Sequence, residues 1–381
     1  MHAINVFSPD FDVDDCLAEI RTCLERGWTG MGFKTDEFEA AFCQYAGLDH
    51  AHFLSSATAG LHLALEVLKR ADGWADGDEV ITTALTFVST NHAILHAGLT
   101  PVFCDVDAML CLDPDAIERA ITPRTRAVMF VGLGGNAGQW DRVVALCRRH
   151  GLRLVLDAAH QSGTRLNGQA PARDADAAVF SFHAVKNLGT ADGGMICLPD
   201  AKLDAAARRL SWLGIDKTTF ERTAASGTYQ WRYDVPEVGF KYHGNSVMAA
   251  IGLVQLRRLE RDNAERRRLA GLYDARLAPV GGIDRVPMAA QCTPSRHLYQ
   301  VEVADRDLVL DRLRGMNIHP GVHYQLNTRF APYDRFSASL PRAEQASDQL
   351  LSLPLHVKMT DGDVQVVCDA LADAVALPMA A

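Results

Sequence analysis

Paired cysteines, long apolar runs and an excess of basic charge are all missing from this sequence of 381 residues. Its nine cysteines are scattered from Cys16 to Cys368 without a CxxC pair, which argues against a zinc site or a disulfide framework and indicates reduced interior thiols. No run approaches the ~18 apolar residues of a membrane span. The first five residues, Met1–Asn5, lack the basic start and apolar stretch of a signal peptide. We therefore expect a soluble, cytoplasmic protein.

The balance of charged residues argues against some classes of binding partner. Lys and Arg number 38 against 47 Asp and Glu, so the formal net charge is −9. A protein that binds nucleic acid or an anionic membrane surface needs a basic patch, which this balance argues against. The length is sufficient for two domains and a large core. Small molecules are the expected ligands.

Apolar and helical patterns alternate through the first two thirds of the chain. Helical patterns such as Asp113–Ile121 and Trp140–His150 separate the apolar runs. The runs are centred near Val80, Val102, Val128, Leu154, Val179 and Met195. This alternation predicts an α/β fold with a mostly parallel sheet, of seven strands, and helices on both faces.

The last third of the chain has a different pattern. A charged helical stretch, Met248–Leu277, precedes a strand pattern at Leu298–Val303 and a helical pattern at Arg306–Met316. We expect a large α/β domain with an N-terminal segment over residues 1–247, and a connecting helix with a small α+β domain over residues 248–381. The polar, aperiodic stretch Trp212–Val235 is expected to form loops near the substrate.

Lys186 is the first candidate for chemistry. It follows the apolar run Ala177–Phe180, which reads as a buried strand. A lysine at the mouth of a strand with apolar neighbours can lose its proton and become a nucleophilic amine. An arbitrary lysine is far more often on the surface. The interpretation of Lys186 as a nucleophile therefore needs support from a second segment of the chain.

Asp157 and His160 form that second segment. The apolar run Leu154–Leu156 ends at Asp157, which places a carboxylate at the carboxyl edge of a parallel strand, where open α/β sheets bind ligands. Pyridoxal phosphate needs a carboxylate at its ring nitrogen, although Asp157 could equally cap a helix. His160 could reach the phenolic oxygen of that cofactor or be an interior histidine.

A third segment, Ser55–Leu65, leads small and hydroxylated residues into a helical pattern. Free amides and hydroxyls at a helix N-terminus can hold a phosphate, but they can also simply cap the helix. Phe87, in the run Leu85–Thr90, could lie flat on a pyridine ring or belong to the core.

One pattern points to a different cofactor. Gly132–Ala137 fits GxGxxA after an apolar run, and Asp157 lies at the end of the next strand. This arrangement is typical of a dinucleotide-binding fingerprint and predicts an NAD-dependent oxidoreductase. That reading leaves Lys186 and the Ser55–Leu65 segment without a role, so it ranks well below the pyridoxal reading.

Taken in order, these segments make the chain similar to a known family. It resembles the DegT/DnrJ/StrS family of pyridoxal-phosphate sugar aminotransferases, of fold type I, over nearly its whole length. The matching segments are Ser55–Leu65, Gly77–Thr82, Pro101–Asp107, Ile121–Thr125, Asp157–His160, Phe180–Asn187 and Leu351–Leu355. Ser55–Gly60, Asp157–His160 and Ser181–Ala184 are most similar to the branch that aminates UDP-4-keto-arabinose.

The resemblance implies a role for each matching residue. Lys186 matches the lysine that binds the cofactor covalently, and Asp157 matches the partner of its ring nitrogen. The expected contacts of the cofactor are Ala57, Thr58, Ala59 and Ser181 at its phosphate, Phe87 stacked on its ring, and His160 where many members carry glutamine. Asn245, in the loop Gly239–Asn245, matches a residue that reaches the site from a partner subunit. The resemblance also places His183, His243, His323 and Tyr324 near the substrate.

The expected enzyme moves an amino group from glutamate or glutamine to a keto-sugar, with a nucleotide-linked 4-keto sugar as the favoured acceptor. The expected assembly is a homodimer with shared active sites and no metal. The alternatives are an aminocyclitol or other keto-sugar aminotransferase, a non-catalytic sensor, and a sugar dehydratase. Dehydratase relatives carry histidine at the lysine position, so Lys186 favours transamination.

Overall fold

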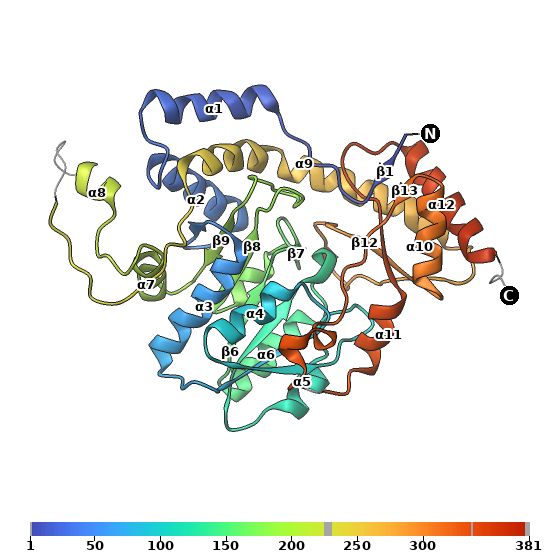
Figure 1. The fold of residues 1–381 in the computed structure, drawn as a ribbon, viewed down its shortest axis with the longest axis horizontal. Coiled ribbons are helices and arrows are strands. Elements are labelled where there is room, and N and C mark those ends of the chain that lie inside the picture. Colours follow the sequence, from blue (N-terminus) through green and yellow to red (C-terminus); the bar gives the residue numbers. More distant parts are fainter. Residues whose placement is uncertain (1, 225–230, 337, 378–381) are drawn as a thin grey trace.

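The computed structural model describes residues 2–224, 231–336 and 338–377. A seven-stranded sheet with the order β2-β9-β8-β6-β5-β3-β4 lies at its centre (Figure 1). Its strands are β2 (His52–Leu54), β3 (Glu79–Thr83), β4 (Thr100–Cys104), β5 (Thr125–Val131), β6 (Arg153–Asp157), β8 (Ala177–Ser181) and β9 (Gly194–Cys197). Among these strands only β9 runs antiparallel to its neighbours. The predicted mostly parallel α/β fold is confirmed.

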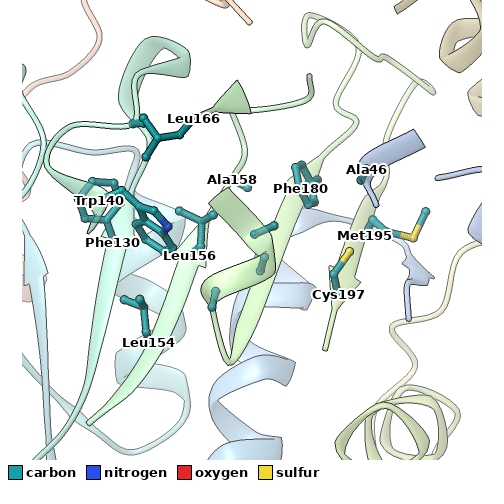
Figure 2. Close-up of a cluster of buried hydrophobic side chains, with 14 of the residues drawn as sticks. Ala46, Phe130, Trp140, Leu154, Leu156, Ala158, Leu166, Phe180, Met195 and Cys197 are labelled. Atoms are coloured by element: carbon teal, nitrogen blue, oxygen red, sulfur yellow. The ribbon is translucent and has the colours of Figure 1, made fainter. Parts of the chain in front are cut away.

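Alternate residues of the strands point to opposite faces of the sheet, and helices cover both faces. Phe130 of β5 packs with α2 (Phe33–Ala46), α5 (Pro114–Ala120) and α6 (Trp140–His150) on one face. Met129 of the same strand packs on the other face. The helices there are α3 (Ala57–Asp72), α4 (Val88–His96) and α7 (Ala201–Ser211). Figure 2 shows the first of these two cores, where Trp140 lies against Phe130 and Leu156.

One long helix, α9 (Ser246–Leu277), connects the large sheet to the C-terminal part (Figure 1). It begins two residues before the predicted start because Asn245 caps it: Asn245 Oδ1 accepts the Met248 N–H at 2.9 Å. Leu253, toward the start of α9, packs in the core of the large sheet, whereas Tyr273 packs in the C-terminal core. The helix α1 (Val13–Glu25) lies along α9.

The C-terminal part is a smaller α+β layer. Its antiparallel sheet has the order β10-β12-β14, and the N-terminal strand β1 pairs in parallel with β13. Its elements are β1 (Ile4–Asn5), β10 (Ile283–Arg285), β12 (Tyr299–Val303), α10 (Arg306–Gly315), β13 (Ile318–His319), α11 (Pro341–Gln349), β14 (Leu350–Leu353) and α12 (Asp361–Ala376), with the small pair β7 (Arg165–Leu166) and β11 (Cys292–Thr293) beside them. The division into domains at residues 247 and 248 stays a prediction.

The stretch predicted as loops, Trp212–Val235, contains a short helix, α8 (Thr219–Ala224), and lies partly outside the described residues. In Figure 1 its described part stands away from the central sheet. Over the residues that can be described, none of the helices is both long enough and apolar enough to span a bilayer.

Candidate functional site

A cavity of about 300 Å³ opens at the carboxyl edge of the central sheet. Because parallel strands end at the same edge, β6 and β8 bring Asp157 and Ser181 to the same cavity. The predicted site residues that line the cavity are Ala57, Thr58, Phe87, Asp157, His160, Ser181, His183, Lys186, His323 and Tyr324. Three predicted residues, Ala59, His243 and Asn245, do not line it.

Lys186 lies in the turn that follows β8, where its N–H donates to the His183 carbonyl at 2.9 Å. Its Nζ makes no hydrogen bond or ion pair with any residue in the described part of the chain. Burial lowers the pKa of the Lys186 amine from 10.5 to about 8, against the opposing effect of the Asp157 carboxylate. The neutral, nucleophilic form of this amine is therefore far more populated near neutral pH than it is for an ordinary lysine.

Asp157 is the last residue of β6 and is 4% exposed. Its Oδ2 accepts the Thr90 hydroxyl at 2.8 Å and its Oδ1 accepts the Ala159 N–H at 3.1 Å. Burial raises the pKa of Asp157, and these hydrogen bonds and the charge of Lys186 only partly oppose that effect. A cation placed beside this carboxylate would therefore be bound favourably.

The N-terminus of α3 forms another wall of the cavity. Ser56 caps the helix by accepting the Ala59 N–H at Oγ, 3.1 Å away, so the Ala59 amide is already used. Ala57 and Thr58 lie in the first turn, where N–H groups have no acceptor within the helix. A Cβ at Gly194 would lie 2.5 Å from the Ala57 nitrogen, so only glycine lets β9 approach this helix end. These two amides fit an anion better than Ala59 does.

The glycine-rich segment after β5 is not a dinucleotide site. The Gly132 N–H donates to the Asp157 carbonyl, and the Gly135 N–H donates to the Gly132 carbonyl. The Gly134 N–H donates to His160 Nδ1 at 3.2 Å. Because these amides are bonded inside the protein, they cannot cradle a pyrophosphate. The NAD alternative is therefore wrong.

Several lining residues were not predicted as site residues, and two of them are aromatic. His297 and Phe7 both line the cavity, and their rings stack with centroids 5.2 Å apart. Both come from segments distant in sequence from the carboxyl ends of the strands, and no local motif marks them. His323 contacts Phe7 as well, and burial lowers the pKa of the His323 imidazole to about 4.

The remaining predicted residues have other contacts in this subunit. His243 Nδ1 lies 2.7 Å from the Gly244 carbonyl, and its ring lies against Trp212. Asn245 is the cap of α9. A role for Asn245 in the site of a partner subunit stays a prediction.

The donor set of the cavity fits pyridoxal phosphate. The group needs an amine for covalent attachment, an anion at its ring nitrogen, and amides or hydroxyls at its phosphate. Lys186 offers an unpartnered amine and Asp157 a buried carboxylate. Ser181 and the first turn of α3 line the same cavity.

Comparison with known proteins agrees with this geometry. The profile of the DegT/DnrJ/EryC1/StrS aminotransferase family matches residues 11–372. The spore coat polysaccharide biosynthesis protein SpsC of Bacillus subtilis (strain 168) is 36% identical over 372 residues, covering 94% of this chain and 94% of SpsC.

Two solved structures have the same fold. The PLP form of the sugar aminotransferase Spr1654 of Streptococcus pneumoniae superposes with a TM-score of 0.89 at 28% identity, over 98% of this chain and 99% of that one. DesI, solved in the presence of its TDP-sugar product, superposes with a TM-score of 0.88 at 30% identity, over 99% of this chain and 94% of that one.

The fold and the cavity define a fold type I transferase of the pyridoxal-phosphate class. Within that class the chain belongs to the DegT/DnrJ/EryC1/StrS family and is a sugar aminotransferase. The family and the PLP form of Spr1654 indicate that it depends on pyridoxal phosphate.

Proposed function

We propose that this enzyme moves an amino group from glutamate or glutamine to the ketone of a nucleotide-linked 4-keto sugar, with Lys186 and Asp157 as its catalytic residues. The observation that carries the proposal is the unpartnered Lys186 amine, with a pKa of about 8, in the same cavity as the buried Asp157 carboxylate.

Each residue has a task that its surroundings support. Bound pyridoxal phosphate supplies the electron sink that stabilises negative charge at the α-carbon of the amino donor. Lys186 Nζ would take the proton from that α-carbon and, in the sugar half-reaction, would deliver a proton to the former ketone carbon of the sugar; such proton transfer contributes about 10²–10⁴-fold. Asp157 holds the positive ring nitrogen, and Ser181 with the Ala57 and Thr58 amides holds the phosphate. Phe87 covers the ring, and the exclusion of water strengthens these charge interactions.

Two observations support a nucleotide-linked sugar. DesI was solved with a TDP-sugar product. The motifs Ser55–Gly60, Asp157–His160 and Ser181–Ala184 resemble those of the branch that aminates UDP-4-keto-arabinose. The cavity itself suits the sugar better than its charged carrier: six of the ten predicted lining residues carry a hydroxyl or an imidazole, and none of the ten is an arginine.

The diphosphate of the carrier would then bind outside this cavity. Among the residues that the structure describes, Lys186 is the only lysine or arginine that lines it. The segment near α8 exposes Trp231, Tyr233 and Val238, which are 69%, 52% and 86% exposed. Exposed apolar groups of this kind favour burial against another subunit. We propose that two chains form a homodimer with shared sites, in which Asn245, His243 and this segment approach the partner's cavity.

The nine cysteines are all unpaired, which supports the proposal that the enzyme works in the reducing cytoplasm.

The test is a substrate panel. Purified protein should absorb in the near ultraviolet or visible region, and borohydride should abolish this absorption. L-Glutamate or L-glutamine should then shift the spectrum, and UDP-4-keto-arabinose or a dTDP-linked 4-keto-6-deoxyhexose should restore it with formation of an amino sugar. Amination of an aminocyclitol ketone alone would support the first alternative. Loss of water from the sugar would indicate a dehydratase, and a donor that leaves the spectrum unchanged would indicate a sensor.

A further inference from the structure

His297 lies in the wall of the cavity with one ring nitrogen fixed by the protein. Its Nδ1 is 3.0 Å from Asn187 Oδ1. The orientation of the Asn187 amide is not ambiguous, because its Nδ2 lies 2.8 Å from the Ser295 carbonyl, which can only accept. The same Nδ2 also donates to Asn263 Oδ1 at 2.7 Å. Asn187 Oδ1 therefore faces His297, and Nδ1 of His297 must carry the proton.

The other nitrogen of His297 is consequently an acceptor. Burial beside His160 and Lys186 lowers the pKa of the His297 imidazole well below its usual value, so the ring is neutral. A neutral imidazole with its proton on Nδ1 has a lone pair on Nε2. Among the described residues the only hydrogen bond of this ring is the one at Nδ1, so Nε2 is without a partner there, and the ring lines the cavity. The stack with Phe7 holds the ring in place.

The Tyr324 hydroxyl is a donor where His297 Nε2 is an acceptor. As for His297, a hydrogen bond to a backbone group fixes this role. The Gly134 N–H donates to His160 Nδ1, so the neutral His160 ring carries its proton on Nε2. His160 Nε2 lies 3.1 Å from the Tyr324 hydroxyl oxygen. Because His160 donates in this contact, Tyr324 accepts there and keeps its own O–H proton for another partner.

From this arrangement we propose that His297 Nε2 and the Tyr324 hydroxyl are specificity-determining groups for the keto-sugar, one accepting from a sugar hydroxyl and the other donating to a sugar oxygen. The inference rests on the proposed function. An acceptor without charge does not attract the carboxylates of the amino donor, whereas a sugar offers both hydroxyl protons and oxygen lone pairs. His297 Nε2 cannot become a donor, and the Tyr324 hydroxyl cannot become a mere acceptor, unless the bond of Asn187 to the Ser295 carbonyl or that of the Gly134 N–H to His160 is broken.

The experiment separates the two half-reactions in the holoenzyme. His297→Phe removes the acceptor and keeps a flat ring for the Phe7 stack. With UDP-4-keto-arabinose and the dTDP-linked 4-keto-6-deoxyhexose as probes, the KM for the accepted sugar should rise about tenfold, the usual worth of one such hydrogen bond. The L-glutamate half-reaction, followed by absorbance, should change several-fold less. His297→Asn, which retains an acceptor oxygen, should recover part of the loss.

Tyr324→Phe is the second variant, because it deletes a single oxygen and is the gentler change to the fold. It should also raise the sugar KM more than it slows the glutamate half-reaction. Equal losses in both half-reactions, or an unchanged sugar KM in both variants, would overturn the inference. Failure of the wild-type protein to react with either amino donor would instead refute the proposed function, so the two failures are distinguishable.

Discussion

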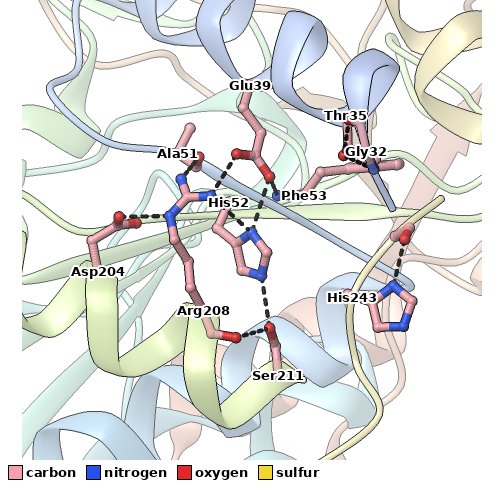
Figure 3. Close-up of polar contacts among 11 residues, drawn as sticks. Gly32, Thr35, Glu39, Ala51, His52, Phe53, Asp204, Arg208, Ser211 and His243 are labelled. Atoms are coloured by element: carbon pink, nitrogen blue, oxygen red, sulfur yellow. Dashed lines mark hydrogen bonds and ion pairs between the residues drawn. The ribbon is translucent and has the colours of Figure 1, made fainter. Parts of the chain in front are cut away.

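Two groups of ionisable side chains differ in how their charges are compensated. One group lies at the start of β2, and the other lies where β6 and β8 end. Around β2, Glu39, His52 and Arg208 form a network in which each charged group has partners (Figure 3). At the carboxyl edge of the sheet, Lys186 has no hydrogen-bond partner among the described residues, and the groups that donate to Asp157 there are neutral.

In the network around β2, each ionisable side chain has at least one hydrogen-bonded partner. Glu39 accepts from the Phe53 N–H at 2.7 Å, from Arg208 at 2.7 Å, and lies 2.9 Å from His52 Nδ1. Burial alone would raise the pKa of the Glu39 carboxyl, but the charges of His52 and Arg208 bring it below its usual value. Arg208 also donates to Asp204 at 2.8 Å and to the Ala51 carbonyl at 2.7 Å. The network therefore fixes the start of β2 to α7.

The cavity is incomplete by comparison. Burial lowers the pKa of Lys186 and raises that of Asp157, because neither charge is compensated by a partner in contact with it. Burial of charge is common to both regions, so burial does not distinguish function from structure. The lack of compensating partners does, and it marks the place where a ligand must complete the site.

The largest expected effect comes from removing the unpartnered amine. Lys186→Ala should lower turnover by about 10⁴-fold or more, since the side chain serves as both nucleophile and proton carrier. The measurement is steady-state amination of the accepted keto-sugar. Since Lys186 Nζ bonds to no other described residue, the melting temperature should not fall. Substantial remaining transamination would refute the assignment of Lys186.

Asp157→Asn tests the other half of the cavity. The amide keeps the shape and can still accept from the Thr90 hydroxyl, but it cannot hold a positive ring nitrogen. Turnover should fall by about 10²–10³-fold, which is typical of losing one electrostatic contact to the reacting system. Weaker retention of pyridoxal phosphate, measured by dialysis and absorbance, should accompany the loss. Unchanged turnover and retention would exclude Asp157 as the partner of the ring.

Removing Glu39 from the network around β2 should lower the free energy of unfolding. Glu39→Leu leaves His52 and Arg208 without their shared carboxylate. Because the Arg208 side chain is 40% exposed and stays partly hydrated, the cost should be about 2–3 kcal/mol, below the ~3–5 kcal/mol of a fully buried pair. The measurement is denaturant unfolding. Glu118→Gln is a matched control because its pair with Arg149 is 50% and 58% exposed, so it should cost less than about 1 kcal/mol. Equal costs for the two variants would remove the distinction between the regions.

The comparison also explains how far the sequence could be read in advance. The sheet was predictable because its strands are short, apolar runs between helical patterns, as Ala177–Phe180 illustrates. Lys186 and Asp157 were predictable because the ends of parallel strands meet at one edge. His297 was not, since it reaches the cavity from the C-terminal part and its role depends on Asn187, 110 positions away. The glycine pattern at Gly132–Ala137 could be ranked low from the sequence but not excluded, because only the fold shows that its amides are bonded internally.

The last expected effect is a pH dependence of the stability of the cofactor-free protein, caused by the uncompensated charge of Lys186. Lys186 has a pKa of about 8 when folded, against 10.5 as its ordinary value in an unfolded chain. Between these values the unfolded chain binds more protons, so the stability of the cofactor-free protein rises with pH there. Below pH 8 the folded protein carries the full cost of a buried ammonium, which a shift of this size sets at about 3 kcal/mol. That cost disappears as pH approaches 10.5.

Lys186→Met should therefore stabilise the cofactor-free protein below pH 8 and lose its advantage toward pH 10.5. Denaturant unfolding across this range measures the difference. Lys202→Met, at an exposed position near the start of α7, controls for the exchange of lysine for methionine itself. An advantage for Lys186→Met that persisted unchanged to pH 10.5 would mean that packing, and not an uncompensated charge, sets the cost of this lysine. The amine would then resemble the satisfied charges around Glu39, and the case for a site prepared to bind a ligand would lose its physical basis.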